Sequence, residues 1–195
     1  METLGSKSVA ALLVGFTLAG CATTSLTSYQ DPAFADVRFG KVAVLATDVQ
    51  LDDRIALENR VVGALRNKRV TAEAVMRIVP PTRSLSDDEL SAALLADGYD
   101  AVLIVQRVEA GSKIEPSWSQ MLGGSSANAT AEHLYASFDT SLIDLETHQV
   151  AWMASARTGG SEYAGAADLV ASFADNTADA LESKQLLAQR APLQR

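Results

Sequence analysis

The stretch Gly98-Tyr99-Asp100-Ala101-Val102-Leu103-Ile104-Val105 decides the fold of this chain. Residues 101–105 form a short, uninterrupted apolar run with β-branched side chains, which favours a strand over a helix. A continuous apolar run of this length is typical of a strand that is buried on both faces of a parallel or mixed sheet. We therefore expect residues 101–105 to lie at the centre of the sheet of an α/β domain.

The chain before this strand alternates between strand and helix patterns. Residues 41–46 (KVAVLA) predict a buried strand, and Asp52 or Asp53 is expected to cap a helix that runs to about residue 68. Residues 70–79 (VTAEAVMRIV) predict another strand, which ends where two prolines follow. Because crossovers between neighbouring strands are right-handed, this part of the sheet is expected to be parallel.

A capping box precedes the central strand, and a hairpin follows it. Ser86 and Glu89 have the spacing of a capping box, which predicts a helix that ends at Gly98. The C-terminal half adds a long strand, a hairpin partner and a last amphipathic helix: residues 134–143, 150–153 and 165–187. We predict one α/β domain over residues 39–188, with a mixed sheet of about five strands and three helices in the order strand-helix-strand-helix-strand-hairpin-helix.

The N-terminus has the pattern of an export signal. Lys7 lies before a short uncharged run, residues 8–20, which is below the roughly 20 apolar residues that a bilayer span requires. Leu18-Ala19-Gly20-Cys21 resembles the lipobox of bacterial lipoproteins. The resemblance implies that residues 1–20 are a lipoprotein signal peptide, that Cys21 carries diacylglycerol, and that an acyl chain such as palmitate is added to its new amine.

The lipobox also implies a location. Stable anchoring takes more than one acyl chain, which diacylglycerol supplies. Because Ala22 stands where an Asp would retain a lipoprotein at the inner membrane, we expect an outer-membrane anchor with the domain in the periplasm. Residues 21–38 are small, polar and irregular, which favours a flexible tether, and residues 189–195 are expected to be a disordered tail.

Composition excludes several kinds of partner. Cys21 is the one cysteine, so the chain forms no internal disulfide, and the net charge is −8. Such acidity argues against a nucleic-acid partner and against a polybasic membrane contact. The partners that remain are the membrane, through the lipid, and another envelope protein.

Three further stretches carry a resemblance to known proteins: residues 41–44 (KVAV), 98–103 (GYDAVL) and 144–152 (DLETHQVAW). With the lipobox and the last helix, they look like a group of small bacterial lipoproteins. Their domain is similar to the periplasmic α/β domains of the curli-secretion lipoprotein and of the lipoprotein activators of penicillin-binding proteins. The resemblance implies a fold and no catalytic site. Members usually have Gly at the position of His148, a turn position that favours positive φ.

The sequence contains no recognisable catalytic or metal-binding constellation. His133 and His148 are the two histidines, and they are expected near opposite ends of one strand, too far apart to share a metal ion. No Gly-rich phosphate loop follows the strand at residues 41–46, and the Gly-Gly-Ser stretches lack the pattern of a nucleophile elbow. We therefore expect no metal and no cofactor, and we do not expect an enzyme.

One charge breaks the pattern of the first helix. At 100° per residue, Glu58 falls within the apolar stripe, and Arg54 lies one turn before it. An unpaired charge on that face would be costly to bury. The sequence predicts a structural Arg54–Glu58 ion pair at the core margin, with a pocket lined by both residues as the alternative.

A long Gly/Ser-rich loop over residues 110–131 carries three large apolar side chains. Trp118, Met121 and Leu122 lie in otherwise small, polar sequence, and we expect them to contact a partner. The alternative is that Trp118 folds back on the domain.

The leading hypothesis is therefore a non-enzymatic envelope lipoprotein that binds another protein or acts as an assembly module. The alternative is a ligand-binding or enzymatic domain with its site at the carboxyl ends of the strands, near Thr47, Asp48 and Gln106.

Overall fold

A six-stranded sheet with the strand order β1-β6-β5-β4-β2-β3 organises the chain. The computed structural model describes residues 21–83, 85–116 and 130–189. The strands are β1 (Ala22–Gln30), β2 (Lys41–Thr47), β3 (Thr71–Ala74), β4 (Ala101–Pro116), β5 (Thr130–Asp144) and β6 (Val150–Gly160). The helices are η1 (Pro32–Phe34), α1 (Leu51–Asn67), α2 (Val75–Ile78), α3 (Asp87–Ala96) and α5 (Ala166–Ser183). The predicted α/β class with a mixed sheet is confirmed.

Strand β4 occupies the interior of the sheet, as its apolar sequence predicts. It pairs in parallel with β2, with Val42 opposite Ala101, and antiparallel with β5 on its other side. Strands β2 and β3 are also parallel, whereas β5, β6 and β1 pair antiparallel in succession. The crossover half and the hairpin half therefore meet at β4.

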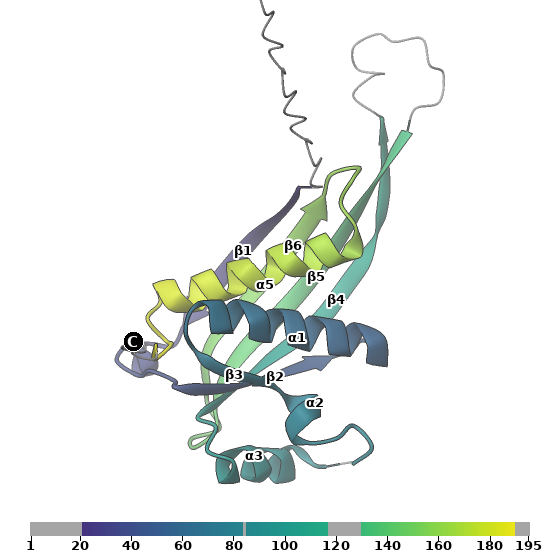
Figure 1. The fold of residues 1–195 in the computed structure, drawn as a ribbon. Helices are drawn as coiled ribbons and strands as arrows, with labels where there is room; N and C mark the ends of the chain where they lie inside the picture. The colour runs from purple at the N-terminus through teal and green to yellow at the C-terminus, as the bar shows by residue number, and fades with distance from the viewer. Residues whose placement is uncertain (1–20, 84, 117–129, 190–195) are drawn as a thin grey trace, which may run out of the picture.

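The helices cover the two faces of the sheet unequally (Figure 1). Helices α1 and α5 lie together on one face, where Val42 and Val44 of β2 join the larger core cluster. The intervening Ala43 points to the other face, where a smaller cluster includes Val75 of α2 and Leu94 of α3. The end of the sheet that contains β2 and β3 thus has three layers. We call it the covered end.

The other end of the sheet has helices on one face only. Strand β2 pairs with β4 as far as Gln106, and β4 continues to Pro116 beside β5. Figure 1 shows these two strands extending past α1 and α5. We call this part the projecting end; it comprises β4 and β5 beyond β2, the start of β1 and the end of β6. The predicted loop over residues 110–131 is wrong at both margins, because residues 110–116 continue β4 and Thr130 begins β5.

The flexible tether predicted for residues 21–38 is also wrong, because it contains strand β1 and helix η1. Strand β1 pairs with β6 over nine consecutive residues, from Ala22 opposite Gly160 to Gln30 opposite Trp152. Its inner face is held largely by hydroxyl groups: Thr24 Oγ1 lies 2.9 Å from Thr158 Oγ1 and 2.8 Å from Ser172 Oγ of α5. Hydrogen bonds of this kind leave little hydrophobic alternation in the sequence.

Two local predictions need smaller corrections. Gln50, and neither Asp52 nor Asp53, is the N-cap of α1, and the two aspartates lie in its first turn. The strand predicted for residues 70–79 ends at Ala74, where the chain turns into α2. The capping box of Ser86 and Glu89 is present as predicted.

Two turns show the left-handed backbone that the sequence analysis expected. Gly98 follows α3 with φ of 76°, and His148 has φ of 57° in the β5–β6 turn. A residue with a Cβ is disfavoured in this region, so His148 stands where Gly would fit at lower cost. The His148 side chain compensates in part, because its Nε2 lies 3.2 Å from Ser91 Oγ of α3.

Candidate functional site: an apolar groove at the projecting end

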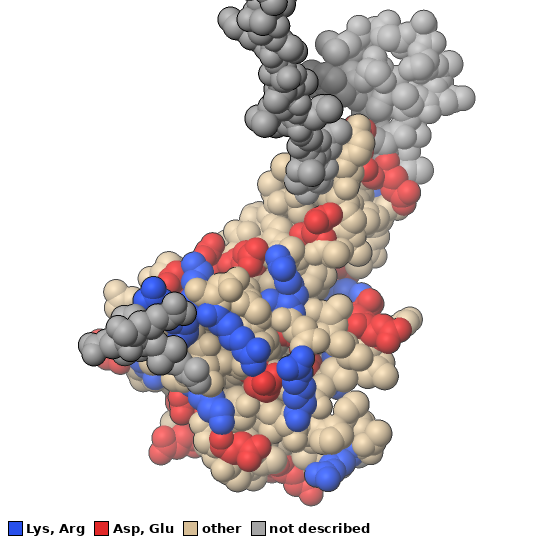
Figure 2. Space-filling model, in the orientation of Figure 1, with Lys and Arg blue, Asp and Glu red and all other residues tan. Residues whose placement is uncertain are grey.

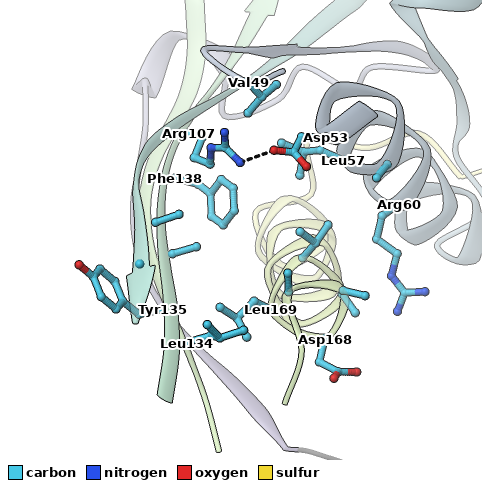
Figure 3. A pocket seen from close by; sticks show the side chains of 18 of the residues that line it. Val49, Asp53, Leu57, Arg60, Arg107, Leu134, Tyr135, Phe138, Asp168 and Leu169 are labelled. Carbon is cyan, nitrogen blue, oxygen red and sulfur yellow. Dashed lines mark hydrogen bonds and ion pairs between the residues drawn. The ribbon is translucent and has the colours of Figure 1, made fainter. Parts of the chain in front are cut away.

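A groove of about 860 Å³ opens between the first turns of α1 and α5 and the projecting strands β4 and β5. Figure 3 shows Leu57 of α1, Leu169 of α5, and Phe138 and Leu134 of β5 around it. The volume falls within the range of about 300–1,000 Å³ that is typical of small-molecule sites in proteins. A mostly apolar wall of this kind fits an apolar ligand.

Small residues leave the groove open. Ala110, Gly111 and Ser112 form its β4 wall, and Ala166 and Ala167 begin α5 opposite them. A Cβ at Gly111 would lie 2.9 Å from the Tyr135 hydroxyl oxygen on the neighbouring strand, so a larger residue there would displace the Tyr135 side chain. This site was not predicted from the sequence; the available signal is the pair of Ala/Gly-rich stretches 110–112 and 164–167.

Charged residues lie on the rim of the groove, and their charges are already engaged. Arg107 Nη1 donates to Asp53 Oδ2 at 2.7 Å, as Figure 3 shows. Arg60 lies 3.6 Å from Asp175, and the Asp168 carboxylate accepts the Gly165 backbone N–H at 2.8 Å. The rim therefore presents few charges that lack a partner of opposite sign or a hydrogen bond.

The alternative site proposed near Thr47, Asp48 and Gln106 lies beside this rim. The structure brings two of these residues together, with Gln106 Nε2 donating to Asp48 Oδ2 at 2.8 Å. Val49, the next residue along the chain after Asp48, lines the groove. The carboxyl end of β2 and the middle of β4 therefore lead into the groove.

Arg54 and Glu58 lie together at the covered end. Arg54 Nε is 2.8 Å from Glu58 Oε1, and the Glu58 side chain is fully buried. The carboxylate also accepts the Ala46 N–H of β2 at 3.1 Å and the Met76 N–H of α2 at 3.3 Å. Glu58 therefore joins α1 to the end of β2 and the start of α2, which explains why the strand predicted for residues 70–79 stops early.

Cys21 is exposed and directly precedes β1 at the projecting end. Its carbonyl accepts the Ser161 N–H at 3.0 Å, so the loop between β6 and α5 rests against it. Tyr163 in this loop is two-thirds exposed, and a hydrogen bond to Glu162 raises the pKa of its phenol. The residue with lipobox spacing and the groove thus occupy the same end of the sheet.

The other predicted residues fall into two groups. Trp118, Met121 and Leu122 lie outside the described residues, as do residues 1–20 and 190–195. His133 contacts Gly160 through Nδ1 at 3.2 Å, whereas His148 contacts Ser91, so the two histidines have different surroundings. Within the described ranges, no group of three His, Cys, Asp or Glu residues is arranged to hold a metal ion, and no helix has the length and apolarity needed to cross a bilayer.

Ion pairs join α1 to α5 on the helical face of the molecule, where Figure 2 shows basic and acidic side chains interleaved. Lys68 Nζ lies 2.5 Å from Asp179 and 2.8 Å from Glu182. Hydrogen bonds to Asp179 and then to Glu182 raise the pKa of Lys68 above its ordinary value. Part of the acidic face of the last helix is therefore neutralised within the domain.

The comparisons with known proteins place the fold. No protein-family model and no curated protein matches the sequence. The structure is similar to PelC from Paraburkholderia phytofirmans, described as a dodecamer, with a TM-score of 0.54 and 16% identity over 86% of this chain and 100% of that chain. A substituted form of the same protein gives a TM-score of 0.50 and 15% identity, again over 86% and 100%.

A further solved structure is the lipoprotein GNA1162 from Neisseria meningitidis. It gives a TM-score of 0.47 and 12% identity over 74% of this chain and 99% of that chain. At these identities, the likeness to PelC shows a common fold and no more. The chain therefore has the fold of a small bacterial α/β protein.

Proposed function

We propose that this protein is a membrane-anchored envelope lipoprotein whose domain is a non-enzymatic assembly module. Cys21 carries the lipid, and the domain faces the periplasm from the outer membrane. The lipobox supports the anchor, and the resemblance to the curli-secretion and penicillin-binding-protein activator domains supports an accessory role. The observation that carries the proposal is strand β1, which starts one residue after Cys21 and forms an edge of the sheet.

The direct junction between Cys21 and β1 determines the orientation of the anchored domain. A lipid on Cys21 leaves no linker before the paired residues Ala22 and Gly160. The projecting end must then lie at the bilayer surface, with the covered end directed away from it.

The edge of β1 is suited to strand addition. Its sequence, ATTSLTSYQ, has no charged residue and no proline, and its pairing with β6 shows no bulge. Natural edge strands usually carry charged residues, prolines or bulges, because these features prevent pairing with other chains. In the described part of the chain, no strand lies on the outer side of β1. An added strand would gain main-chain hydrogen bonds there without burying a charge.

The partner that we propose is a second copy of the chain. The similar structure of PelC is described as a dodecamer, which supports self-assembly within this fold. Two β1 strands paired antiparallel would place their Cys21 residues at opposite ends of the pair. Pairing β1 with the part of β4 beyond Gln106, which runs antiparallel to β1, would keep both Cys21 residues at one bilayer.

The anchor is tested by the mass of the protein purified from membranes. We expect a polypeptide that begins at Cys21 and carries diacylglycerol, whereas a Cys21→Ser protein lacks the added mass. A wild-type protein without this mass would contradict the anchor.

The assembly is tested by sedimentation of lipid-free protein over a range of concentrations. We expect the wild-type protein to form dimers or larger species and Thr27→Lys on β1 to shift them to monomers. Met153→Lys is the matched control, because Met153 is exposed on the neighbouring strand β6, which has strands on both sides. A monomeric wild-type protein, or equal loss in both variants, would contradict pairing through β1.

The groove favours a second candidate function, the binding of an apolar ligand. Its volume and its mostly apolar wall are the specific observation. This function is compatible with the first, because the groove is lined by side chains, whereas strand pairing would use the main chain at the edges of β1 and β4.

A further inference from the structure

The end of the groove that is lined by Leu134 and Leu169 lies close to Cys21. Ala22 is paired with Gly160, and a Cβ built on Gly160 would lie 3.0 Å from Leu169 Cδ1. Leu169 and Leu134 line the groove, and His133, which precedes Leu134, contacts the Gly160 carbonyl at 3.2 Å. Gly160 therefore separates the start of β1 from this end of the groove. Since β1, β6 and β5 are adjacent strands, the lateral distance from Cys21 to β5 is about two strand spacings, or roughly 10 Å.

We propose that the groove holds one of the acyl chains attached to Cys21. This inference rests on the proposed lipidation, and it adds a binding site for that lipid within the domain. Because no tether separates Cys21 from β1, the lipidated residue stays beside the groove. An acyl chain on Cys21 then needs to pass only the loop between β6 and α5 to enter the groove. The occupant is thus part of the same molecule and is always present at a high effective concentration.

The chemistry of the groove suits a ligand without polar groups. Its wall includes Leu57, Ala110, Leu134 and Leu169, which offer contacts to methylene groups and no charges. Each rim charge is already in an ion pair or a hydrogen bond, so a polar ligand would have to displace existing partners. An acyl chain requires no such exchange, because it neither donates nor accepts hydrogen bonds.

The energetics permit one chain to leave the bilayer. Lipid tails and aliphatic side chains are comparably apolar, so transfer of a chain into the groove changes its own solvation little. The chain also covers apolar groove wall that water would otherwise contact, which favours the transfer. A lipoprotein with three chains would keep two in the bilayer, which is enough for stable anchoring.

The test compares binding of a fluorescent dansyl-undecanoic acid by two forms of the protein. One is the lipidated protein, and the other is a Cys21→Ser protein that starts at residue 21, since all described elements lie within residues 21–189. Both are titrated in the same non-ionic detergent. We expect saturable binding of one probe by the Cys21→Ser protein and at least tenfold weaker binding by the lipidated protein, whose own chain competes.

A substitution on β4 locates the site. Ala110→Phe in the Cys21→Ser protein should weaken probe binding at least tenfold, because Ala110 lines the groove. Val108→Phe is the matched control on the same strand, since Val108 is exposed and does not line the groove. Thermal unfolding of both variants verifies that the fold is retained.

Each result has a distinct meaning. No saturable binding by the Cys21→Ser protein, or an equal effect of both phenylalanine substitutions, would overturn the acyl site. Equal binding by the lipidated and Cys21→Ser proteins would show that the groove takes acyl chains from elsewhere and would overturn the proposed occupant. A mass without diacylglycerol would instead contradict the proposed anchor and, with it, this source of the chain.

Discussion

The covered end and the projecting end of the same sheet are stabilised by different means. At the covered end, fully buried Val42, Val44 and Leu103 pack under helices, and Glu58 ties three backbone segments together. At the projecting end, hydrogen bonds between hydroxyl groups hold β1 in place. Small residues on β4 leave a groove open. The covered end therefore contains most of the packing that specifies the fold, whereas the projecting end leaves a groove open to solvent.

Substitution of Glu58 is expected to cause the largest loss of stability, and it tests the covered end most directly. Glu58→Ala removes the acceptor for the Ala46 and Met76 N–H groups and leaves Arg54 without its ion-pair partner. Removing one member of a buried pair typically destabilises a protein by about 3–5 kcal/mol. Urea unfolding should show a loss of this size, and Glu58→Gln, which retains an acceptor oxygen, should lose less.

The coupling between Arg54 and Glu58 is measured by a double-mutant cycle with Arg54→Met. We expect a coupling clearly above the roughly 0–1 kcal/mol of exposed pairs. A coupling near zero would mean that the backbone contacts of Glu58, and not the ion pair, account for its burial.

Thr24 provides the equivalent test at the projecting end. Thr24→Val keeps the shape and β-propensity of the side chain but removes the hydrogen bonds to Thr158 and Ser172. The expected loss is about 1 kcal/mol for such a bond. Urea unfolding measures it, with Thr27→Val as the exposed control on the same strand. A loss as large as that of Glu58→Ala would erase the contrast between the two ends.

His148 tests whether the β5–β6 turn at the covered end is strained. His148→Gly should raise the free energy of unfolding by about 0.5–1 kcal/mol, because Gly adopts positive φ without steric cost. Loss of the contact with Ser91 works against this gain. A matched Ser91→Ala variant separates the two effects, and a destabilised His148→Gly protein would show that the side-chain contact dominates.

The smallest expected effect concerns the capping box of α3. The hydrogen bonds from Ser86 lower the pKa of Glu89 below its ordinary value. Because the folded-state pKa is depressed, the stabilisation is present above the unfolded-state pKa and is lost as pH falls through the folded-state value. Ser86→Ala should lower the free energy of unfolding by about 1 kcal/mol at neutral pH. On acidification below pH 4.5, the free energy of unfolding of this variant should fall less than that of the wild type. The same pH dependence of the free energy of unfolding in both proteins would contradict a contribution of Ser86 to the lowered pKa of Glu89.

The same contrast explains what the sequence allowed us to predict. At the covered end, the apolar run 101–105, the Ser86–Glu89 box and Gly98 each follow a local rule, and the structure agrees with those predictions. The Glu58 anomaly was visible, but its contacts with Ala46 and Met76 were not, because they join residues that lie 12 and 18 positions away. Long-range hydrogen bonds leave no periodic trace in a sequence.

At the projecting end the local rules failed. Strand β1 has a single large aliphatic side chain, Leu26, on its inner face, so its Ser/Thr-rich sequence resembled a tether. Threonine and tyrosine favour strands, which was the available signal. The groove could not be predicted, because it depends on small residues from α1, α5, β4 and β5 meeting in space.

The orientation of the domain on the membrane tests the central claim most directly. In lipidated protein whose Cys21 thiol is blocked by lipid, a bimane label is attached to Tyr163→Cys at the projecting end or to Leu95→Cys on α3 at the covered end; both positions are exposed. Bilayers containing nitroxide lipids should quench the bimane at position 163 strongly and the bimane at position 95 little. Equal quenching at the two positions, or stronger quenching at position 95, would contradict a domain that is held by Cys21 with its projecting end against the bilayer.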